Sequence, residues 1–176
     1  MSKKRRNHRR RKSGFKSFVN FLVALSIVVI LGFAVRTFVA VPVTISGDSM
    51  AETYNSGDVV LATRFDYLFA GPERGDVVLC QVKGRDGMYV KRVVALPGDL
   101  VEIANGTLTI NGAPVDEPYV THLSSETMTV QLEEDQYMVL GDNRAVSYDS
   151  REEDVGMLSK ADFAGKVRMR LWPLGQ

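Results

Sequence analysis

The stretches GDVVLCQV at residues 75–82 and MYVKRVVAL at residues 88–96 decide the fold class of this chain. Both are short, rich in Val and bounded by Gly, Asp or Pro, a composition typical of β-strands. Five further runs follow the same pattern: GDVVLATRF at 57–65, DLVEI at 99–103, TLTI at 107–110, YMVL at 137–140 and KVRMRLW at 166–172. Seven short strands at these spacings predict an all-β domain of the sandwich or barrel type.

Two local signals refine this prediction. Asn105 and Gly106 separate two of the runs, and Asn-Gly supplies the positive φ angles that a tight hairpin requires. The stretch SKADFAGK at residues 159–166 is the best helix signal after residue 35, because Ser159 can cap a single turn that Gly165 ends. We therefore expect one hairpin and one short helical turn within the β-domain.

A long apolar run precedes the β-rich region. Residues 18–35, FVNFLVALSIVVILGFAV, contain no charge, and an α-helix of that length spans about 27 Å, close to the hydrocarbon thickness of a bilayer. The alternatives are a buried core helix and a cleaved secretory signal. We expect a permanent membrane anchor, because so small a chain has too little else to bury this helix. The segment after it, RTFVAVPVTI, also lacks a convincing small-x-small cleavage site.

The net charge of +1 conceals an uneven distribution. Residues 1–17 hold nine Lys and Arg and no acid, whereas residues 18–176 hold 13 Lys and Arg against 21 Asp and Glu, a net charge of −8. Such a basic tail can bind nucleic acid, but positive charges before an apolar helix stay in the cytoplasm. We predict a cytoplasmic tail at 1–17 and an anchor at 18–36, with Arg36 at the outer headgroups. An extracytoplasmic domain follows at 37–176, in contact with membrane lipid and not with nucleic acid.

The segment ISGDSMAETYNSGD at residues 45–58 raises the question whether Ser49 is a turn hydroxyl or a nucleophile. A serine hydroxyl needs an adjacent base to act as a nucleophile. His8 lies in the basic tail. His122 lies in the polar stretch THLSSE, and nothing in this setting favours it as the base, although the sequence leaves a pair of Ser49 with His122 open. Lysine can take the place of histidine where burial lowers its pKa and keeps the amine neutral.

Lys91 interrupts an apolar strand, and strand alternation puts its side chain on the face of Tyr89 and Val93. Taken alone, this pattern indicates an exposed lysine on a polar face; beside a candidate nucleophile, Lys91 becomes the candidate base. The single cysteine, Cys80, is interpreted as a small buried strand residue. No His, Cys and Asp cluster has the spacing of metal ligands, so neither a metal nor a cofactor is predicted.

Four motifs occur in order along the chain: VRTFVAVPVTISGDSM, ERGDVVLC, YVKRVVALPGD and GDNRAVSYDSR. Together they resemble the successive boxes of bacterial type I signal peptidases, over roughly Arg36 to Pro173. The third and fourth motifs are highly specific, whereas ERGDVV alone is weak. The resemblance implies a β-domain of the LexA and signal peptidase type. It also implies a serine-lysine endopeptidase that removes the signal peptides of secreted preproteins at the outer face of the cytoplasmic membrane.

The resemblance further implies a role for each matching residue. Ser49 would be the nucleophile, with its backbone N–H in the oxyanion hole, Lys91 the neutral general base, and Ser147 the hydroxyl that orients the amine. The other implied residues are a turn glycine beside the oxyanion hole, two supporting ion pairs and two substrate-binding neighbours: Gly47, Arg92 with Asp142, Asp149 with Arg151, and Met50 with Val90.

The sequence departs from the family pattern at two places. In S-M-x-P-T, Glu52 stands instead of Pro, and the spacing between Arg151 and Gly156 is longer than usual. Self-cleaving repressors of the LexA type share the serine-lysine domain but carry a DNA-binding domain where this chain has its apolar run. Eukaryotic-type signal peptidases carry His where Lys91 stands. An alternative of another class is an inactive, membrane-tethered β-module that binds exported polypeptides, with Glu52 marking the lost activity.

Overall fold

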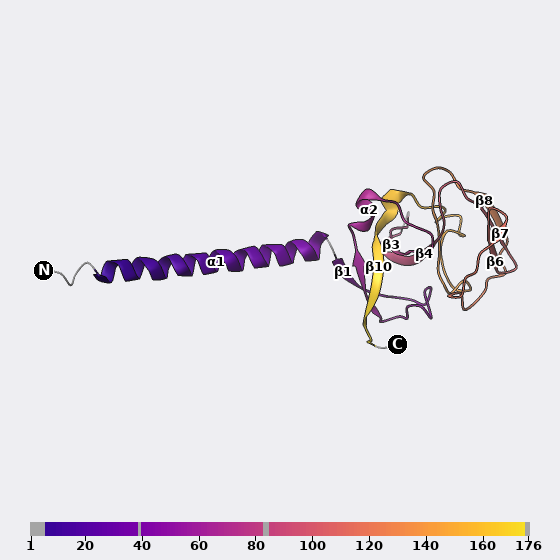
Figure 1. The fold of residues 1–176 in the computed structure, drawn as a ribbon. Helices are drawn as coiled ribbons and strands as arrows, with labels where there is room; N and C mark the ends of the chain where they lie inside the picture. Colours follow the sequence, from indigo (N-terminus) through magenta and orange to yellow (C-terminus); the bar gives the residue numbers. More distant parts are fainter. Residues whose placement is uncertain (1–5, 39, 83–84, 175–176) are drawn as a thin grey trace. The chain divides into compact units, whose positions relative to one another are not determined.

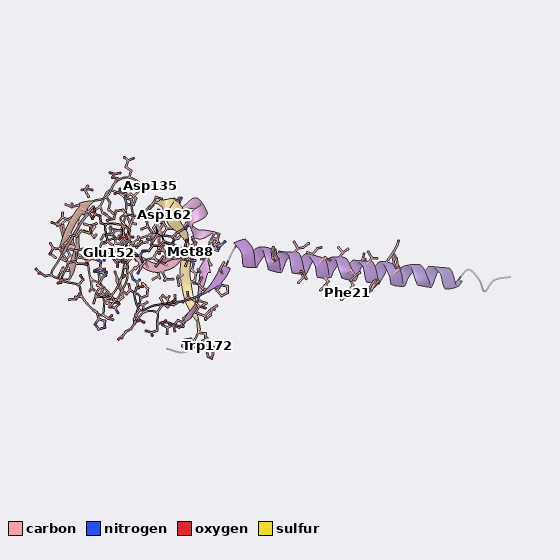
Figure 2. The ribbon with its side chains drawn as sticks, turned by 180° about the vertical axis from the view of Figure 1, so that it is seen from behind. Phe21, Met88, Asp135, Glu152, Asp162 and Trp172 are labelled. Atoms are coloured by element: carbon pink, nitrogen blue, oxygen red, sulfur yellow. The ribbon has the colours of Figure 1, made fainter. Side chains whose placement is uncertain are left out.

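The computed structural model describes residues 6–38, 40–82 and 85–174, which divide into two units, Met1–Val39 and Ala40–Gln176. The described part of the first unit is the helix α1 (Arg6–Phe38). Its stretch Gly14–Phe33 has a mean hydropathy of 2.1 and is long and apolar enough to cross a membrane. Apolar side chains such as Phe21 stand out from this helix (Figure 2). The side chains of residues 1–13, which carry most of the basic tail's charge, and of Arg36 lie outside the described part.

The second unit is built from two antiparallel sheets (Figure 1). In its described residues, the first sheet has six strands in the order β1-β2-β10-β3-β4-β9 and the second has four in the order β7-β6-β5-β8. The strands are β1 (Ala40–Thr44), β2 (Val59–Thr63), β3 (Val77–Cys80), β4 (Tyr89–Ala95), β5 (Leu100–Ala104), β6 (Thr107–Ile110), β7 (Ala113–Pro114), β8 (Met128–Gln131), β9 (Met138–Leu140) and β10 (Phe163–Trp172). The predicted mainly β class is therefore confirmed.

The first sheet is packed on both faces, which explains the nearly continuous apolar runs of its central strands. All four residues of β3 are buried. One face packs a cluster that includes Val78, Cys80 and Val93, and the other packs a cluster that includes Met50 and Leu79. In Figure 1, β10 passes between β2 and β3, the strands it pairs with.

The second sheet buries one face only, and its strands alternate accordingly. Inward-facing residues of β5 and β6 join residues from the ends of β4 and β9 in one cluster between the sheets. The turn between β5 and β6 has positive φ at Asn105 (50°) and at Gly106 (78°), so the hairpin predicted from the Asn-Gly pair is present. This sheet lies on the side of the unit away from β10 (Figure 1).

The structure corrects the sequence prediction at two kinds of place. Three strands were missed: β1, β7 and β8. The strand β1 contains Pro42, which is tolerated because β1 is an edge strand, and every second residue of β8 is exposed.

The short helical turn is the 3₁₀-helix η1 (Lys160–Asp162), capped by Ser159 as predicted. The prediction that Gly165 ends it was wrong, because Gly165 lies inside β10, pressed against the Thr63 carbonyl of β2. In the part of this unit that the structure describes, the remaining helix is the short α2 (Asp66–Phe69).

Candidate active site

Ser49 lies in the turn that joins β1 to β2. Backbone hydrogen bonds hold the base of this turn, from Ile45 N–H to the Asp58 carbonyl (2.8 Å) and from Gly57 N–H to the Ile45 carbonyl (3.0 Å). Gly47 has a φ of +88°, a conformation that favours glycine, and its N–H donates to Ser56 Oγ (3.3 Å). The turn thus bends sharply just before Ser49.

Ser49 itself is partly exposed. Its carbonyl accepts a hydrogen bond from the Asn143 N–H (3.1 Å), which joins the Ser49 turn to the GDNR motif. Within the residues that the structure describes, no hydrogen bond uses the Ser49 N–H or its hydroxyl. Both groups are therefore free to meet a bound peptide, and a hydroxyl without a fixed partner can rotate about one bond.

Lys91 is buried, with 2% of its surface exposed. It pairs with Val78 across the sheet, on the face that packs Cys80 and Val93. Burial among these apolar atoms lowers the pKa of the Lys91 amine from its usual 10.5, and the charge of Asp149 opposes this only in part. The amine Nζ donates a hydrogen bond to Ser147 Oγ (2.9 Å). Lys91 thus has the dry surroundings and the hydroxyl partner that a neutral amine requires.

Gly141 is the point at which Ser49 and Ser147 meet. A Cβ atom built on Gly141 would lie 2.2 Å from Ser147 Oγ and 2.3 Å from the Ser49 carbonyl oxygen. Both oxygens therefore touch the bare α-carbon of this glycine. Because Ser147 also holds the Lys91 amine, these contacts bring the Ser49 turn, the GDNR loop and β4 into one site.

Asp142 is fully buried and paired with Arg92. Its two carboxylate oxygens accept hydrogen bonds from Arg92 Nε (2.8 Å) and from a terminal Arg92 nitrogen (2.7 Å). Thr53 Oγ1, four residues after Ser49 in the same turn, donates a third (2.6 Å). The pair expected from the resemblance is present, and it also fixes the turn that carries Ser49.

Asp149 and Arg151 form the second pair, joined at 2.8 Å and almost wholly buried. Asp149 Oδ2 accepts the Gly141 N–H (2.9 Å). Arg151 donates to the carbonyls of Arg144 (2.9 Å) and Ser147 (3.1 Å). The pair therefore closes the loop from Gly141 to Arg151 into one hydrogen-bonded unit around Ser147.

The remaining residues named from the sequence lie nearby but do different things. Met50 is 1% exposed and packs in the core, and Val90 packs on that same cluster, on the face of β4 opposite Lys91. The substrate contacts expected of these two side chains stay predictions. His122 lies in a loop whose backbone bridges to Asn143. Glu52 is exposed, and the Ala51–Glu52 peptide bond is cis.

The structure adds residues that the sequence did not single out. Arg144 is buried, donates to the Gly141 carbonyl (3.0 Å) and pairs with Glu117 (2.6 Å). Thr53 binds Asp142 as described above. Arg144 stood inside the GDNR motif and could have been found there, whereas Glu117 lies in an irregular segment without any periodic signal. No three His, Cys, Asp or Glu side chains gather as metal ligands in the described part of the chain.

Three comparisons place the chain among known proteins. The family described as signal peptidase, peptidase S26, matches residues 18–172. Signal peptidase IB of Staphylococcus aureus (strain Mu50 / ATCC 700699) is 34% identical over 180 residues, which cover 92% of this chain and 93% of that protein. Signal peptidase I S of Bacillus subtilis (strain 168) is 34% identical over 173 residues, with 92% of each covered. A signal peptidase I from Enterococcus faecalis V583, known from its crystal structure, has a TM-score of 0.50 and 29% identity, covering 56% of this chain and 98% of that one.

Proposed function

This chain belongs to the signal peptidase family, peptidase S26, whose members are serine peptidases that cleave signal peptides, and we propose that its catalytic groups are Ser49 and Lys91. The observation that carries this proposal is the buried Lys91 amine, which is hydrogen-bonded to Ser147 Oγ (2.9 Å) beside the turn that holds Ser49. A buried amine of lowered pKa can act as the base that a serine nucleophile needs.

The reaction starts when the neutral Lys91 amine accepts the proton of the Ser49 hydroxyl. Ser49 Oγ then forms a bond to the carbonyl carbon of the scissile peptide, and the carbonyl electron pair moves to its oxygen. When this intermediate collapses, the C–N bond breaks and the Lys91 ammonium gives its proton to the departing amine. Lys91 next deprotonates a water molecule, whose oxygen forms a bond to the acyl carbon. The ester bond to Ser49 Oγ then breaks, the acid leaves, and the Lys91 ammonium returns its proton to Ser49 Oγ, which restores both side chains.

The Ser49 N–H supports the developing oxyanion in this proposal. It is not engaged by any other described residue, and the bend at Gly47 presents it at the start of the turn. A backbone donor fixed in this way stabilises the charge on the oxygen because it needs no reorganisation during the reaction. Met50 and Val90 are proposed as neighbours of the bound peptide on the core side.

Ser147 and the two ion pairs keep the base neutral and in place. A hydroxyl accepts the Lys91 hydrogen bond without favouring the ammonium form, as a carboxylate in the same position would. The pair of Arg92 and Asp142 ties β4 to the Ser49 turn, and the pair of Asp149 and Arg151 supports the Ser147 loop.

We also propose that α1 anchors the enzyme in the cytoplasmic membrane. The nine Lys and Arg in residues 1–17 and the apolar stretch Gly14–Phe33 support an N-terminus inside and a catalytic domain outside. The domain boundaries are then 1–17 for the tail, 18–36 for the anchor and 37–176 for the catalytic domain. In this location the proposed partners of the catalytic domain are signal peptides and membrane lipid, and the membrane separates that domain from cytoplasmic nucleic acid.

The test uses the full-length protein in detergent and a preprotein whose signal peptide ends in Ala-x-Ala, the small-x-small pattern of such cleavage sites. Wild type, Ser49→Ala and Lys91→Met are incubated with the preprotein, and the products are identified by mass. Ser46→Ala, an exposed serine of the same turn, is the matched control. We expect wild type and Ser46→Ala to cut at the signal boundary and the other two variants to leave the preprotein intact.

Two outcomes contradict the proposal. Cleavage by folded Ser49→Ala or Lys91→Met at the wild-type rate would remove these residues from the mechanism. Intact preprotein with every variant and with wild type, when a control peptidase cuts the same substrate, would instead favour the inactive β-module, and Glu52→Pro would then be the first reversion to try.

A further inference from the structure

The irregular segment between β7 and β8 contacts several parts of the site that hold Ser49, Lys91 and Ser147. We call residues 117–126 the strap. The strap begins three residues after β7 ends at Pro114 and ends two residues before β8 begins at Met128, so the second sheet holds the chain on both sides of it. None of its residues belongs to the motifs from which the site was recognised.

The strongest contact of the strap is the ion pair of Glu117 with Arg144. The two partners are joined by hydrogen bonds of 2.6 Å and 3.1 Å, and their side chains are only 8% and 5% exposed. Arg144 Nε also donates to the Gly141 carbonyl (3.0 Å). Glu117 therefore reaches, through one guanidinium, the glycine against which Ser147 Oγ packs.

The second contact connects the strap to Arg92, the cationic member of the ion pair with Asp142. The Tyr119 hydroxyl donates to Glu117 Oε1 (2.8 Å), and the Arg92 guanidinium lies 3.9 Å from the centre of the Tyr119 ring. Arg92 comes from β4, next to Lys91, and holds Asp142. Tyr119 thus completes a path from the strap to the strand that carries the base.

Three more contacts fix the rest of the strap. Thr121 Oγ1 donates to the Ala51 carbonyl in the Ser49 turn (3.2 Å), and the backbone at His122 bridges to Asn143. Glu126 pairs with Arg151 (2.7 Å). The strap accordingly touches the Ser49 turn, the GDNR loop and the second ion pair, the parts whose relative positions define the site.

We propose that the strap is a positioning element for catalysis and that Glu117 is its principal positioning residue. Glu117 acts through Arg144 and Gly141 to hold Ser147 against the Lys91 amine and to keep water from it. This inference rests on the proposed roles of Ser49 and Lys91. It extends the site from the motif residues to the strap, so that the second sheet, which holds the strap on both sides, helps to position the catalytic groups.

The distinguishing variant is Glu117→Gln, which keeps the shape and an acceptor oxygen but leaves the buried Arg144 guanidinium without its anionic partner. Loosening of the GDNR loop then exposes the Lys91 amine to water, and its pKa rises toward 10.5. We expect kcat to fall by about tenfold or more, KM to change by less than about threefold, and the acid limb of the kcat/KM profile to move to higher pH. Glu134→Gln, the same change at an exposed position, should leave all three at wild-type values.

A merely structural role would lower only the amount of folded enzyme. Each rate is therefore divided by the folded fraction, measured by circular dichroism on the same sample. Tyr119→Phe serves as a milder variant if Glu117→Gln folds poorly, because it removes one hydroxyl and keeps the ring against Arg92. It should shift the acid limb in the same direction by a smaller amount.

A double-mutant cycle tests whether Glu117 acts through Ser147. In the Ser147→Ala background the loss caused by Glu117→Gln should shrink to less than about a third of its loss in wild type, since the contact it supports is already absent. An unchanged acid limb in both strap variants, or a full and independent loss in the Ser147→Ala background, would overturn the proposal. Failure of the underlying dyad would look different, because Ser49→Ala in the same assay would then retain activity.

Discussion

Replacing Gly141 with Ala would insert a methyl group between the two serines of the site. The new Cβ would lie 2.2 Å from Ser147 Oγ and 2.3 Å from the Ser49 carbonyl oxygen. Non-bonded heavy atoms ordinarily stay about 3.5 Å apart, so each oxygen has to move by roughly 1 Å. The hydrogen bond between Lys91 and Ser147 is 2.9 Å long, and a displacement of that size carries it beyond hydrogen-bonding distance.

The expected result is a large loss of kcat with a modest loss of stability. A misplacement of about 1 Å at a catalytic group lowers the rate about 100-fold, and overpacking a well-filled site costs about 1–3 kcal/mol. Cleavage of an Ala-x-Ala preprotein is followed at saturating and at limiting substrate, at a temperature where circular dichroism shows the variant to be folded. The loss of kcat should exceed the change in KM.

Gly165→Ala is the matched control. Its Cβ would lie 2.6 Å from the Thr63 carbonyl, where β10 pairs with β2, so it overpacks the same domain without touching Ser49, Lys91 or Ser147. We expect a comparable fall in stability and a kcat within about threefold of wild type once the folded fraction is counted. The reasoning is refuted if folded Gly141→Ala keeps the wild-type kcat, or if Gly165→Ala loses as much.

Three other predictions concern the buried groups. Burial holds the pKa of Lys91 in the folded protein below its usual 10.5, so between these two pKa values the unfolded chain binds a proton that the folded chain lacks, and the stability of wild type rises with pH. In thermal melts, the amount by which Lys91→Met is more stable than wild type should therefore shrink from pH 7 to pH 10. Parallel stability curves for the two proteins would contradict this. Asp142→Asn leaves the Arg92 guanidinium without its anionic partner, so denaturant unfolding should show a loss of about 3–5 kcal/mol, and adding Arg92→Met should restore most of it. Burial raises the pKa of the Cys80 thiol to about 12, so iodoacetamide at pH 8 should label it only after unfolding, and rapid labelling of the folded protein would argue against this burial.

The strands that the sequence revealed are those with strong local signals. The buried β3 and β4 appear as dense runs of Val and Leu, and Asn105 with Gly106 fixes the β5–β6 hairpin. The edge strand β1 was hidden by Pro42 and by the apolar run before it. Gly165 looked like a helix end, whereas its missing side chain lets β10 approach the Thr63 carbonyl. That use of glycine depends on a residue 102 positions away, which no local pattern reports.

The candidate site divides in the same way. Ser49, Lys91 and Ser147 could be named because each stands in a recognisable motif, and strand alternation placed Lys91 on the face of Val93. The sequence could suggest that Lys91 is buried and that its pKa is lowered. The extent of this burial depends on the packing around Lys91, which only the folded structure shows. Glu117 was missed because its partner Arg144 lies 27 residues away in the chain, so that only the tertiary fold brings the two side chains together.

The most direct test of the central claim, that a neutral Lys91 activates Ser49, is the pH dependence of kcat/KM for wild type with an Ala-x-Ala preprotein, measured alongside Ser147→Ala. Wild type should show a single acid-limb ionisation below 10.5, moved to higher pH in Ser147→Ala, where the amine loses its hydroxyl partner and gains water. A wild-type rate that keeps rising up to pH 10.5, or an acid limb that is the same in both proteins, would contradict it.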